Sequence, residues 1–259
     1  MYEAVMIAAT GLRHQQARLD TIANNVANVN SAAYKSARLD FRDALYTAGL
    51  VPARPRTPEP EGNQQKGHGV MIAGIVKDFS TGAFQRTDRT LDVAIEGEGF
   101  FELEDPDGNL VYSRNGSFEL GRFDGGFYLL NGDGYFIHDT EGGKIEIPYG
   151  TESIDISVDG VITFTIGEEI TTVELGLYTF RNITGLLSVG NGNYGESIAS
   201  GEKMTADSAK IWQGTLEISN VNLAEEMTRI IRTQRVFQLA SRALKTADDM
   251  EGIANNLRR

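Results

Sequence analysis

The chain of 259 residues has no cysteine and no long uninterrupted apolar run. Without cysteine it can form neither a disulfide framework nor a thiolate metal site. A membrane-spanning helix needs roughly 20 consecutive apolar residues, and no segment approaches that length. The N-terminus lacks a basic n-region, a continuous apolar block and a small-residue cleavage site. We therefore expect that, if the protein leaves the cytoplasm, it uses a route that reads an uncleaved N-terminus.

Positive charge is scarce in the middle of the chain. Residues 51–209 carry 11 Lys and Arg against 26 Asp and Glu, a net charge of −15. Residues 1–50 and 210–259 have net charges of +1 and +2. Because an acidic surface repels phosphates, this distribution argues against a nucleic-acid-binding protein. The acidic middle is interpreted as a solvated surface, and the nearly neutral ends fit surfaces that pack against other chains.

Signals for catalysis or cofactor binding are few. His14, His68 and His138 stand in unrelated settings without the spacing of a zinc site. Gly97-Glu98-Gly99 lacks the third glycine and the following helix of a dinucleotide-binding loop. No glycine-rich loop ends in the Lys-Ser/Thr of a nucleotide-phosphate site. The sequence therefore predicts no enzyme activity, no metal and no cofactor.

Acidic turns resemble ion or sugar sites only in part. DPDGNL, from Asp105, resembles the start of a calcium loop but has Leu110 where that loop requires glycine. NGDG at Asn131 is interpreted as a turn. A polysaccharide-acting enzyme remains an alternative that would need paired carboxylates, one of them with a perturbed pKa. No local pair in the sequence identifies such a site.

Apolar residues recur every three and four positions at both ends of the chain. This spacing is typical of coiled-coil packing and predicts helices over about residues 2–28 and 221–257, the second capped by Asn220 or Asn222. The C-terminal helix also carries a second apolar row, which suggests two neighbours. The rows are Val5, Ala8, Leu12, Gln15, Leu19, Ile22, Val26 and Val29; Val236, Ala240, Ala243, Ala247, Met250, Ala254 and Leu257; and Leu223, Met227, Ile230, Phe237 and Leu244.

Between the helices, short β-branched and aromatic stretches alternate with glycine turns, which predicts antiparallel strands. One hairpin is expected about Asp159-Gly160 and one strand over Val173–Phe180. Residues 36–49 could make a short helix or an extended arm. Residues 49–69 hold four of the six prolines. They are predicted to form a disordered linker, or a loop that orders only when a neighbouring subunit covers it.

These patterns predict an α+β fold. Long N- and C-terminal helices form a coiled-coil-like unit, and a mainly antiparallel all-β central domain is inserted between them. Residues 1–48 plus 205–259 are expected to form a discontinuous helical assembly domain. Residues 49–69 form a proline-rich linker or extended arm, and residues 70–204 the β-rich central domain.

Three segments together resemble the bacterial flagellar rod and hook protein family. They are IANNVANVNSAAYK (Ile22–Lys35), TLDVAIEGEGFFELEDPDGNLVYSRNGSFEL (Thr90–Leu120) and GTLEISNVNLAEEMTRIIRTQRVFQLASRALKTADDM (Gly214–Met250), in the family's order. Ala32-Ala33 and Phe237 depart from the usual residues. The family's motif maps onto Asn24, Asn25, Asn28, Asn30, Tyr34, Lys35, Asn220, Asn222, Glu226, Gln234 and Arg235.

Within that family, Arg181–Glu202 and the long insert before Gly69 are most similar to the distal rod proteins. The resemblance implies a structural subunit that polymerises helically through its terminal helices into a hollow drive shaft transmitting torque from motor to hook. It implies self-association, contact with neighbouring rod and hook proteins and with ring proteins around the rod, and export by the flagellar type III apparatus without a cleaved signal peptide. The expected location is the extracytoplasmic basal body, without membrane insertion. Alternatives are a proximal rod or hook-type subunit, or an adhesin or binding module with a coiled-coil stalk.

The apolar rows give the expected assembly interface. Isolated helices with exposed apolar faces lack the burial that offsets ordering entropy, so we predict termini largely disordered in the monomer. An adhesin with a stalk would instead have ordered termini in a closed oligomer. The interface is predicted to contain Val5, Leu12, Leu19, Ile22, Val26, Leu223, Met227, Ile230, Phe237, Leu244, Met250 and Leu257.

Overall fold

The computed structural model describes residues 2–43, 46–49, 64–67, 70–206 and 208–256. The chain divides into two compact units. The helical unit comprises Met1–Val26, Ala37–Val76 and Leu223–Arg259; the β unit comprises Ala27–Ser36 and Lys77–Asn222. Most of the predicted proline-rich linker, 49–69, lies outside the described residues. The predicted domain boundaries, which concern independent folding and assembly, stay a prediction.

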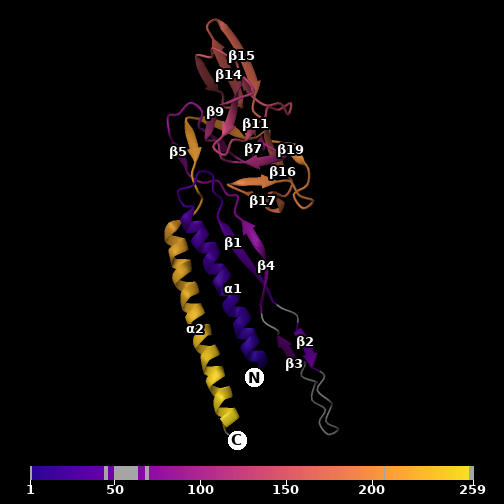
Figure 1. Cartoon of the computed structure of the whole chain (residues 1–259), viewed down its shortest axis with the longest axis vertical. Helices are drawn as coiled ribbons and strands as arrows, with labels where there is room; N and C mark the ends of the chain where they lie inside the picture. The colour runs from indigo at the N-terminus through magenta and orange to yellow at the C-terminus, as the bar shows by residue number, and fades with distance from the viewer. Residues whose placement is uncertain (1, 44–45, 50–63, 68–69, 207, 257–259) are drawn as a thin grey trace. The chain divides into compact units, whose positions relative to one another are not determined.

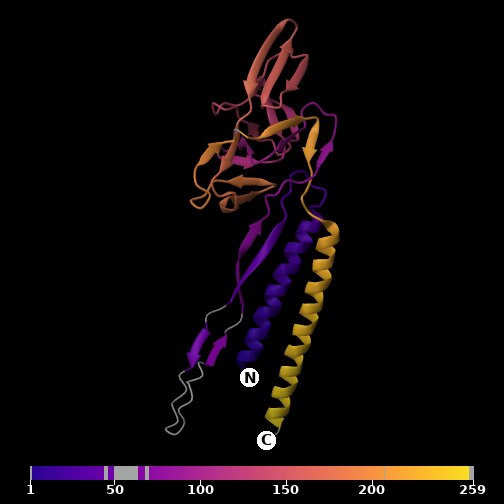
Figure 2. The same ribbon diagram turned by 180° about the vertical axis from the view of Figure 1, so that it is seen from behind.

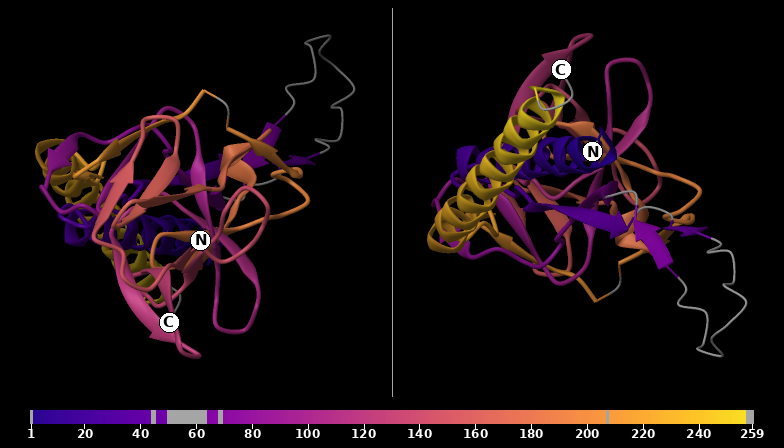
Figure 3. Two further views of the ribbon diagram at one scale, coloured as in Figure 1. Left: turned by 90° about the horizontal axis from the view of Figure 1, so that it is seen from above. Right: turned by 90° about the horizontal axis from the view of Figure 1, so that it is seen from below.

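Two long helices occupy the ends of the chain, as the spacing predicted. They are α1 (Tyr2–Ala27) and α2 (Leu223–Asn256). Glu225 and Glu226 lie in the first turn of α2, where acidic side chains favour the positive end of the helix dipole. The helices run in opposite directions (Figures 1 and 2), and their axes are inclined to each other (Figure 3).

The helical unit also contains two small sheets. β1 (Ala37–Asp43) pairs with β4 (Val70–Lys77), and β2 (Tyr46–Gly49) pairs antiparallel with β3 (Gln64–Gly67). The described part of residues 36–49 is therefore extended, which was one of the two predicted alternatives. On β1, the Phe41 ring meets the His14 ring of α1 edge to face at 6.1 Å between centroids. This contact fixes α1 against β1.

The β unit is built around one large antiparallel sheet. Its main strand order is β12-β10-β11-β7-β8-β18-β17, with β9 beside β10, β16 beside β7 and β19 beside β16. The strands are β7 (Phe100–Glu104), β8 (Leu110–Ser113), β9 (Phe118–Phe123), β10 (Gly126–Asn131), β11 (Phe136–Ile137), β12 (Glu146–Ile147), β16 (Leu177–Phe180), β17 (Leu187–Gly190), β18 (Asn193–Gly195) and β19 (Lys203–Thr205).

Three smaller sheets and a 3₁₀ turn (Ile183–Gly185) complete the unit. The order β13-β14-β15 makes one sheet, while β20 pairs with β6 and β21 with β5, all antiparallel. The predicted hairpin about Asp159-Gly160 is confirmed, since it joins β13 to β14. The strands are β5 (Phe84–Arg86), β6 (Val93–Glu96), β13 (Ser153–Ile156), β14 (Val161–Ile166), β15 (Glu169–Glu174), β20 (Lys210–Gln213) and β21 (Thr215–Glu217).

The predicted single strand over Val173–Phe180 is wrong. Its first two residues end β15 and its last four form β16, and these strands belong to different sheets. The break falls at Gly176, whose amide donates to the His138 carbonyl at 3.0 Å. A Cβ at Gly176 would lie 2.7 Å from the Asp139 carbonyl oxygen, so only glycine fits this close crossing.

Two hydrophobic clusters lie on opposite sides of β7. Successive side chains of a strand point to opposite faces, so Phe100 joins an aromatic cluster while Phe101 joins the main core. Both rings are almost fully buried. The aromatic cluster also contains Tyr112, Tyr178, Phe180 and Tyr194. One strand therefore ties both halves of the interior together.

Candidate functional site: the terminal helices and a buried ionic junction

The predicted assembly residues of α1 lie mostly on its shielded face. Leu12, Leu19 and Val26 are half-buried within the single chain, and Ile22 is 5% exposed. Val5 lies in α1, and nothing is said of its side chain. The apolar row of α1 is thus largely covered before any second copy is present.

Helix α2 differs, because apolar side chains occupy more than one side of it. Its half-buried apolar side chains are spaced by three, four or seven residues and combine members of both predicted rows: Ile230, Phe237, Ala240, Leu244 and Ala247. Seven large apolar side chains of α2 are 45–64% exposed: Leu223, Met227, Ile231, Val236, Leu239, Met250 and Ile253. The sequence rows included only four of these seven. The predicted Leu257 lies outside the described residues.

The family-motif residue Lys35 takes part in a buried cluster, here called the ionic junction: Lys35, Arg114 and Glu217. The Lys35 Nζ lies 2.6 Å from Glu217 Oε1, and the Arg114 Nε lies 2.9 Å from Glu217 Oε2. All three side chains are at most 3% exposed. One carboxylate therefore serves two cations from segments 103 and 182 residues away in the chain.

Backbone groups complete the ionic junction. Arg114 donates to the carbonyls of Ile95, Gly97 and Gly99 at 3.0–3.1 Å. Lys35 donates to the Ser80 carbonyl at 2.7 Å. These bonds, with those to Glu217, occupy all five donors of Arg114 and two of the three donors of Lys35. Hydrogen bonds of this kind offset the cost of burying a charge.

Electrostatics within the junction favour its charged carboxylate. Burial raises the pKa of Glu217, but Arg114 and then Lys35 more than offset this, so its pKa lies below the usual range. Burial and then Arg114 lower the pKa of Lys35, against the opposing effect of Glu217. Gly82 donates its amide to Glu217 at 2.7 Å, and a Cβ on Gly82 would collide with the Ile218 carbonyl oxygen. The loop at Gly82 can therefore approach Glu217 only because it has no side chain.

Two motif asparagines fasten backbone segments. Asn25 donates to the Ala37 carbonyl and accepts from the Ala37 amide, both at 2.9 Å, which holds the end of α1 to the start of β1. Asn220 accepts from the Ser36 amide at 2.8 Å and donates to the Asp78 carbonyl at 2.8 Å. The Asn220 side chain is thus used within the β unit, and Asn222 is the residue that directly precedes α2.

The other motif residues play local or surface roles. Asn28 accepts from the Ser31 hydroxyl at 3.1 Å, and the Lys77 ammonium lies 5.9 Å from the centre of the Tyr34 ring. Arg229 donates to Glu226 at 2.7 Å. The remaining motif residues are exposed: Asn24, Asn30, Asn222, Gln234 and Arg235.

A second buried charge cluster, which the sequence gave no signal for, surrounds His138. Its Nε2 lies 3.0 Å from Glu104 and its Nδ1 lies 3.8 Å from Glu102. Lys203 pairs with Glu102 at 2.6 Å, and Lys144 pairs with Glu104 at 3.0 Å. The Glu102 carboxylate raises the pKa of His138, burial opposes this, and Glu104 adds to the increase. Because every carboxylate in this cluster has a basic partner, the arrangement is suited to stabilising the β unit.

Neither cluster has the donor set of a metal site. Within the described ranges, no group of three or more His, Cys, Asp or Glu residues could hold a metal ion. Nor, in that part of the chain, is either helix long and apolar enough to cross a membrane. The ionic junction and Asn220 join three segments that are distant in the sequence, all within the β unit. Their role is therefore to hold the fold together mechanically.

Models of known protein families match the three segments that meet in the ionic junction. Family models match residues 6–35 ("Flagella basal body rod protein"), 94–164 ("Flagellar hook protein FlgE/F/G D1 domain") and 213–257 ("Flagellar basal body rod FlgEFG protein C-terminal"). Lys35, Arg114 and Glu217 each fall in a different one of these matches. The buried junction therefore links all three matched regions.

Three relatives that match over almost their whole length carry the same name. The chain is 38% identical to the flagellar basal-body rod protein FlgG of Borreliella burgdorferi, with both chains covered completely. It is 35% identical to FlgG of Bacillus subtilis, again over both chains completely, and 36% identical to FlgG of Buchnera aphidicola subsp. Schizaphis graminum, covering 96% of this chain and 97% of the relative. The protein belongs to the flagellar basal-body rod family and is a structural subunit of the rod.

Proposed function

We propose that this subunit polymerises helically through its terminal helices into a hollow shaft that transmits torque from motor to hook, most closely as a distal rod protein. The observation that carries the proposal is the set of seven exposed apolar side chains on α2. Large apolar side chains exposed repeatedly along one helix favour an interaction with other chains. Contacts that repeat head to tail without closing generate a filament.

The proposal includes a coiled-coil-like pairing of α1 with α2. Support comes from shielded rows spaced by three and four on both helices, for example Leu12 and Leu19 on α1 and Phe237 and Leu244 on α2. The remaining apolar side chains of α2 would then face neighbouring copies. The predicted interface residues Val5, Leu12, Leu19, Ile22, Val26, Leu223, Met227, Ile230, Phe237, Leu244, Met250 and Leu257 are proposed to be buried on assembly.

Membership of the rod family supports a proposal for the further partners and the location. We propose that the subunit contacts neighbouring rod and hook proteins, that ring proteins surround the assembled rod, and that the type III apparatus exports the chain to the extracytoplasmic basal body. The function is mechanical, without catalysis or cofactor. The proposed assembly domain is 1–48 plus 205–259, with 70–204 as the outer β-rich part.

The test is assembly of full-length variants, followed by sedimentation and electron microscopy. Leu19→Glu and Phe237→Glu place a charge in the proposed helix contacts, and we expect both to abolish polymerisation. Gln238→Glu is the matched control, because it places the same charge at an exposed position next to Phe237. Near-ultraviolet circular dichroism should show a folded β unit in all three. Normal filaments from Phe237→Glu would refute assembly through these helices.

Limited proteolysis of the monomer separates the rod proposal from a stalked adhesin. Under the rod proposal, both helical ends are more sensitive to protease in the monomer than the β unit is, and they become protected after assembly. Ends that resist digestion in solution, together with a closed oligomer of fixed size, would favour the stalk.

A further inference from the structure

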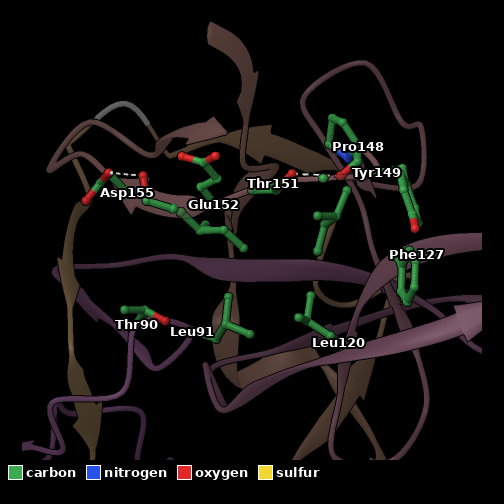
Figure 4. Close-up of a pocket in the computed structure, with 13 residues that line it drawn as sticks. Thr90, Leu91, Leu120, Phe127, Pro148, Tyr149, Thr151, Glu152 and Asp155 are labelled. Carbon is green, nitrogen blue, oxygen red and sulfur yellow. Dashed lines mark hydrogen bonds between the residues drawn. The ribbon is translucent and has the colours of Figure 1, made fainter. Parts of the chain in front are cut away.

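Two buried polar atoms of the cluster around His138 face each other without a hydrogen bond. His138 Nδ1 and Glu102 Oε2 lie 3.8 Å apart, and neither bonds to any atom of the residues that the structure describes. Carboxylates elsewhere in the β unit are solvated: Glu152 and Asp155, which line a groove of about 560 Å³ (Figure 4), are both exposed. The Glu102 side chain is fully buried, so its oxygens depend on donors from the protein.

The neighbouring atoms of the cluster have partners. Glu102 Oε1 accepts from Lys203 Nζ at 2.6 Å and from the Tyr112 hydroxyl at 3.1 Å. His138 Nε2 lies 3.0 Å from Glu104 Oε2. An ionised carboxylate only accepts hydrogen bonds, so Nε2 must carry the hydrogen of this pair. In neutral His138, Nδ1 is then a lone pair that faces the Glu102 carboxylate, and the two cannot bond.

We propose that one proton, taken from solvent by His138 Nδ1, closes a hydrogen bond to Glu102 Oε2 and makes His138 a pH-operated clamp. Protonated His138 donates from both nitrogens, and its two acceptors, Glu102 and Glu104, belong to the same strand, β7. Charge-assisted N–H···O bonds are about 2.7–2.9 Å long, so closure needs a movement of about 1 Å. A single proton thereby satisfies both unpaired atoms.

The clamp acts where three segments of the backbone cross. The His138 amide donates to the Glu102 carbonyl, and the Gly176 amide donates to the His138 carbonyl, both at 3.0 Å. Strand β7 also contributes Phe100 and Phe101 to the two hydrophobic clusters of the β unit. A closed clamp therefore restrains the strand that joins these clusters, together with the crossing at Gly176.

The two carboxylates of the clamp stay ionised while His138 titrates. Burial raises the pKa of Glu102, but His138 and then Lys203 lower it further, so it lies below the usual range. Burial also raises the pKa of Glu104, but Lys144 and then His138 bring it below the usual range. Both acceptors are therefore available over the range in which a histidine ionises.

The remaining titratable neighbours do not compete for the proton. Burial and then Glu102 raise the pKa of Tyr112 in β8 and of Tyr178 in β16, so both hydroxyls stay protonated. The Asp139 carboxylate accepts two amides of its own turn at 2.7 and 2.9 Å. Glu102 raises the pKa of His138 against the opposing effect of burial. The clamp is thus closed below that raised pKa and opens as pH rises through it.

The first test reads the proton directly in the unassembled full-length chain. Nitrogen-15 NMR of the imidazoles, assigned with His138→Gln, shows which nitrogen carries hydrogen at each pH. We expect neutral His138 to carry its hydrogen on Nε2, and both nitrogens to be protonated below the titration midpoint. A neutral form with its hydrogen on Nδ1 would overturn the clamp, because Nδ1 could then donate without a second proton.

Hydrogen exchange of the Gly176 amide measures whether the crossing tightens. Relative to its intrinsic rate, this amide should exchange about twofold to tenfold more slowly about one pH unit below the midpoint than one unit above it, as expected for one net hydrogen bond. The control is the Ile211 amide, which donates to the Val158 carbonyl at 2.9 Å and should not change. Equal protection of Gly176 on both sides of the midpoint would refute the clamp.

Glu102→Gln and Glu104→Gln form a matched pair of variants. In Glu102→Gln the new amide can donate to neutral Nδ1, so the pH dependence of Gly176 exchange should disappear. Glu104→Gln leaves the facing pair of His138 and Glu102 in place, so the dependence should persist. The opposite pattern would assign control to Nε2 and overturn the proposal. All of these measurements use the unassembled chain, so their failure leaves the proposed polymerisation intact.

Discussion

The main hydrophobic cluster of the β unit and helix α2 differ in how far they bury apolar side chains. The main cluster of the β unit contains 15 buried residues, none more than 7% exposed. Helix α2 leaves seven large apolar side chains 45–64% exposed. Burial of apolar area stabilises a fold by roughly 25 cal/mol per Å². The main cluster therefore obtains this stabilisation within one chain, whereas the exposed side chains of α2 do not, and under the proposed assembly further chains would cover them.

Two ion pairs of nearly equal length, one from each unit, differ in burial. In the β unit, Arg114 and Glu217 are 2.9 Å apart and at most 3% exposed. In the helical unit, Arg38 and Asp40 are 3.0 Å apart, but their side chains are 70% and 43% exposed. The two ion pairs are thus matched in length but differ in solvent exposure. Breaking each pair by the same chemical change measures what burial adds.

The largest effect is expected from Glu217→Gln. It leaves Lys35 and Arg114 buried without a counter-charge, so the free energy of unfolding of the β unit should fall by about 3–5 kcal/mol. Urea unfolding can be followed by the fluorescence of Trp212, the only tryptophan of the chain, which lies in β20. The control is Glu119→Gln, at an exposed position of β9, which should change little.

Acid titration gives a second measure of the same group. Because the pKa of Glu217 is lowered in the folded state, its contribution is complete above its unfolded pKa and is lost as pH falls through the folded pKa. The wild-type β unit should therefore lose stability in acid more steeply than Glu217→Gln. Equal acid dependence of the two proteins would mean that Glu217 is not stabilised as an anion.

The next largest effect comes from one substitution made in both regions. Leu129 in β10 is 2% exposed, and Leu239 in α2 is 64% exposed. Leu129→Ala should lower the free energy of unfolding by about 3 kcal/mol, because it removes packed atoms and leaves a cavity. Leu239→Ala should leave monomer stability nearly unchanged but weaken assembly. A large loss of monomer stability from Leu239→Ala would mean that its surface is already used within the chain.

The sequence was informative where the evidence is local. Periodic apolar residues located α1 and α2 to within about two residues, and Asp159-Gly160 located a hairpin. Patterns of this kind depend on neighbours a few positions away, which a single sequence contains. The error at Val173–Phe180 has the opposite origin, because Gly176 breaks the strand where it crosses the distant backbone of His138 and Asp139.

The candidate site could be predicted only in part. Lys35 was identified through a family motif, but its partner Glu217 is 182 residues away, and neither periodicity nor spacing relates them. Arg114 lies in a segment that the family resemblance covers, yet its burial depends on three carbonyls of the crossing chain near Gly97. Such three-dimensional pairings leave no signal in one sequence.

A smaller effect on stability is expected from the ionisation of His138 in the β unit. The described part of α2 has no histidine to compare with it. The pKa of His138 is raised in the folded state, so its stabilising contribution is complete below its unfolded pKa and is lost as pH rises through the folded pKa. The β unit should therefore lose stability as the pH rises above about 6.5, the ordinary pKa of histidine. Thermal unfolding of His138→Gln over the same range should show a flatter dependence. An equally steep dependence in the variant would assign the effect to other groups.

The smallest effect is expected from Asp40→Asn, the exposed counterpart of Glu217→Gln. Solvent screens the Arg38–Asp40 pair, so the free energy of unfolding should change by about 0.5 kcal/mol or less, and added salt should remove even that difference. Far-ultraviolet circular dichroism during urea unfolding measures it. Since the two pairs have nearly the same length, a small loss here beside a large loss for Glu217→Gln would assign the difference to burial. Comparable losses would instead mean that Asp40 acts through something other than its exposed partner, and that the helical unit depends on polar contacts as strongly as the β unit does.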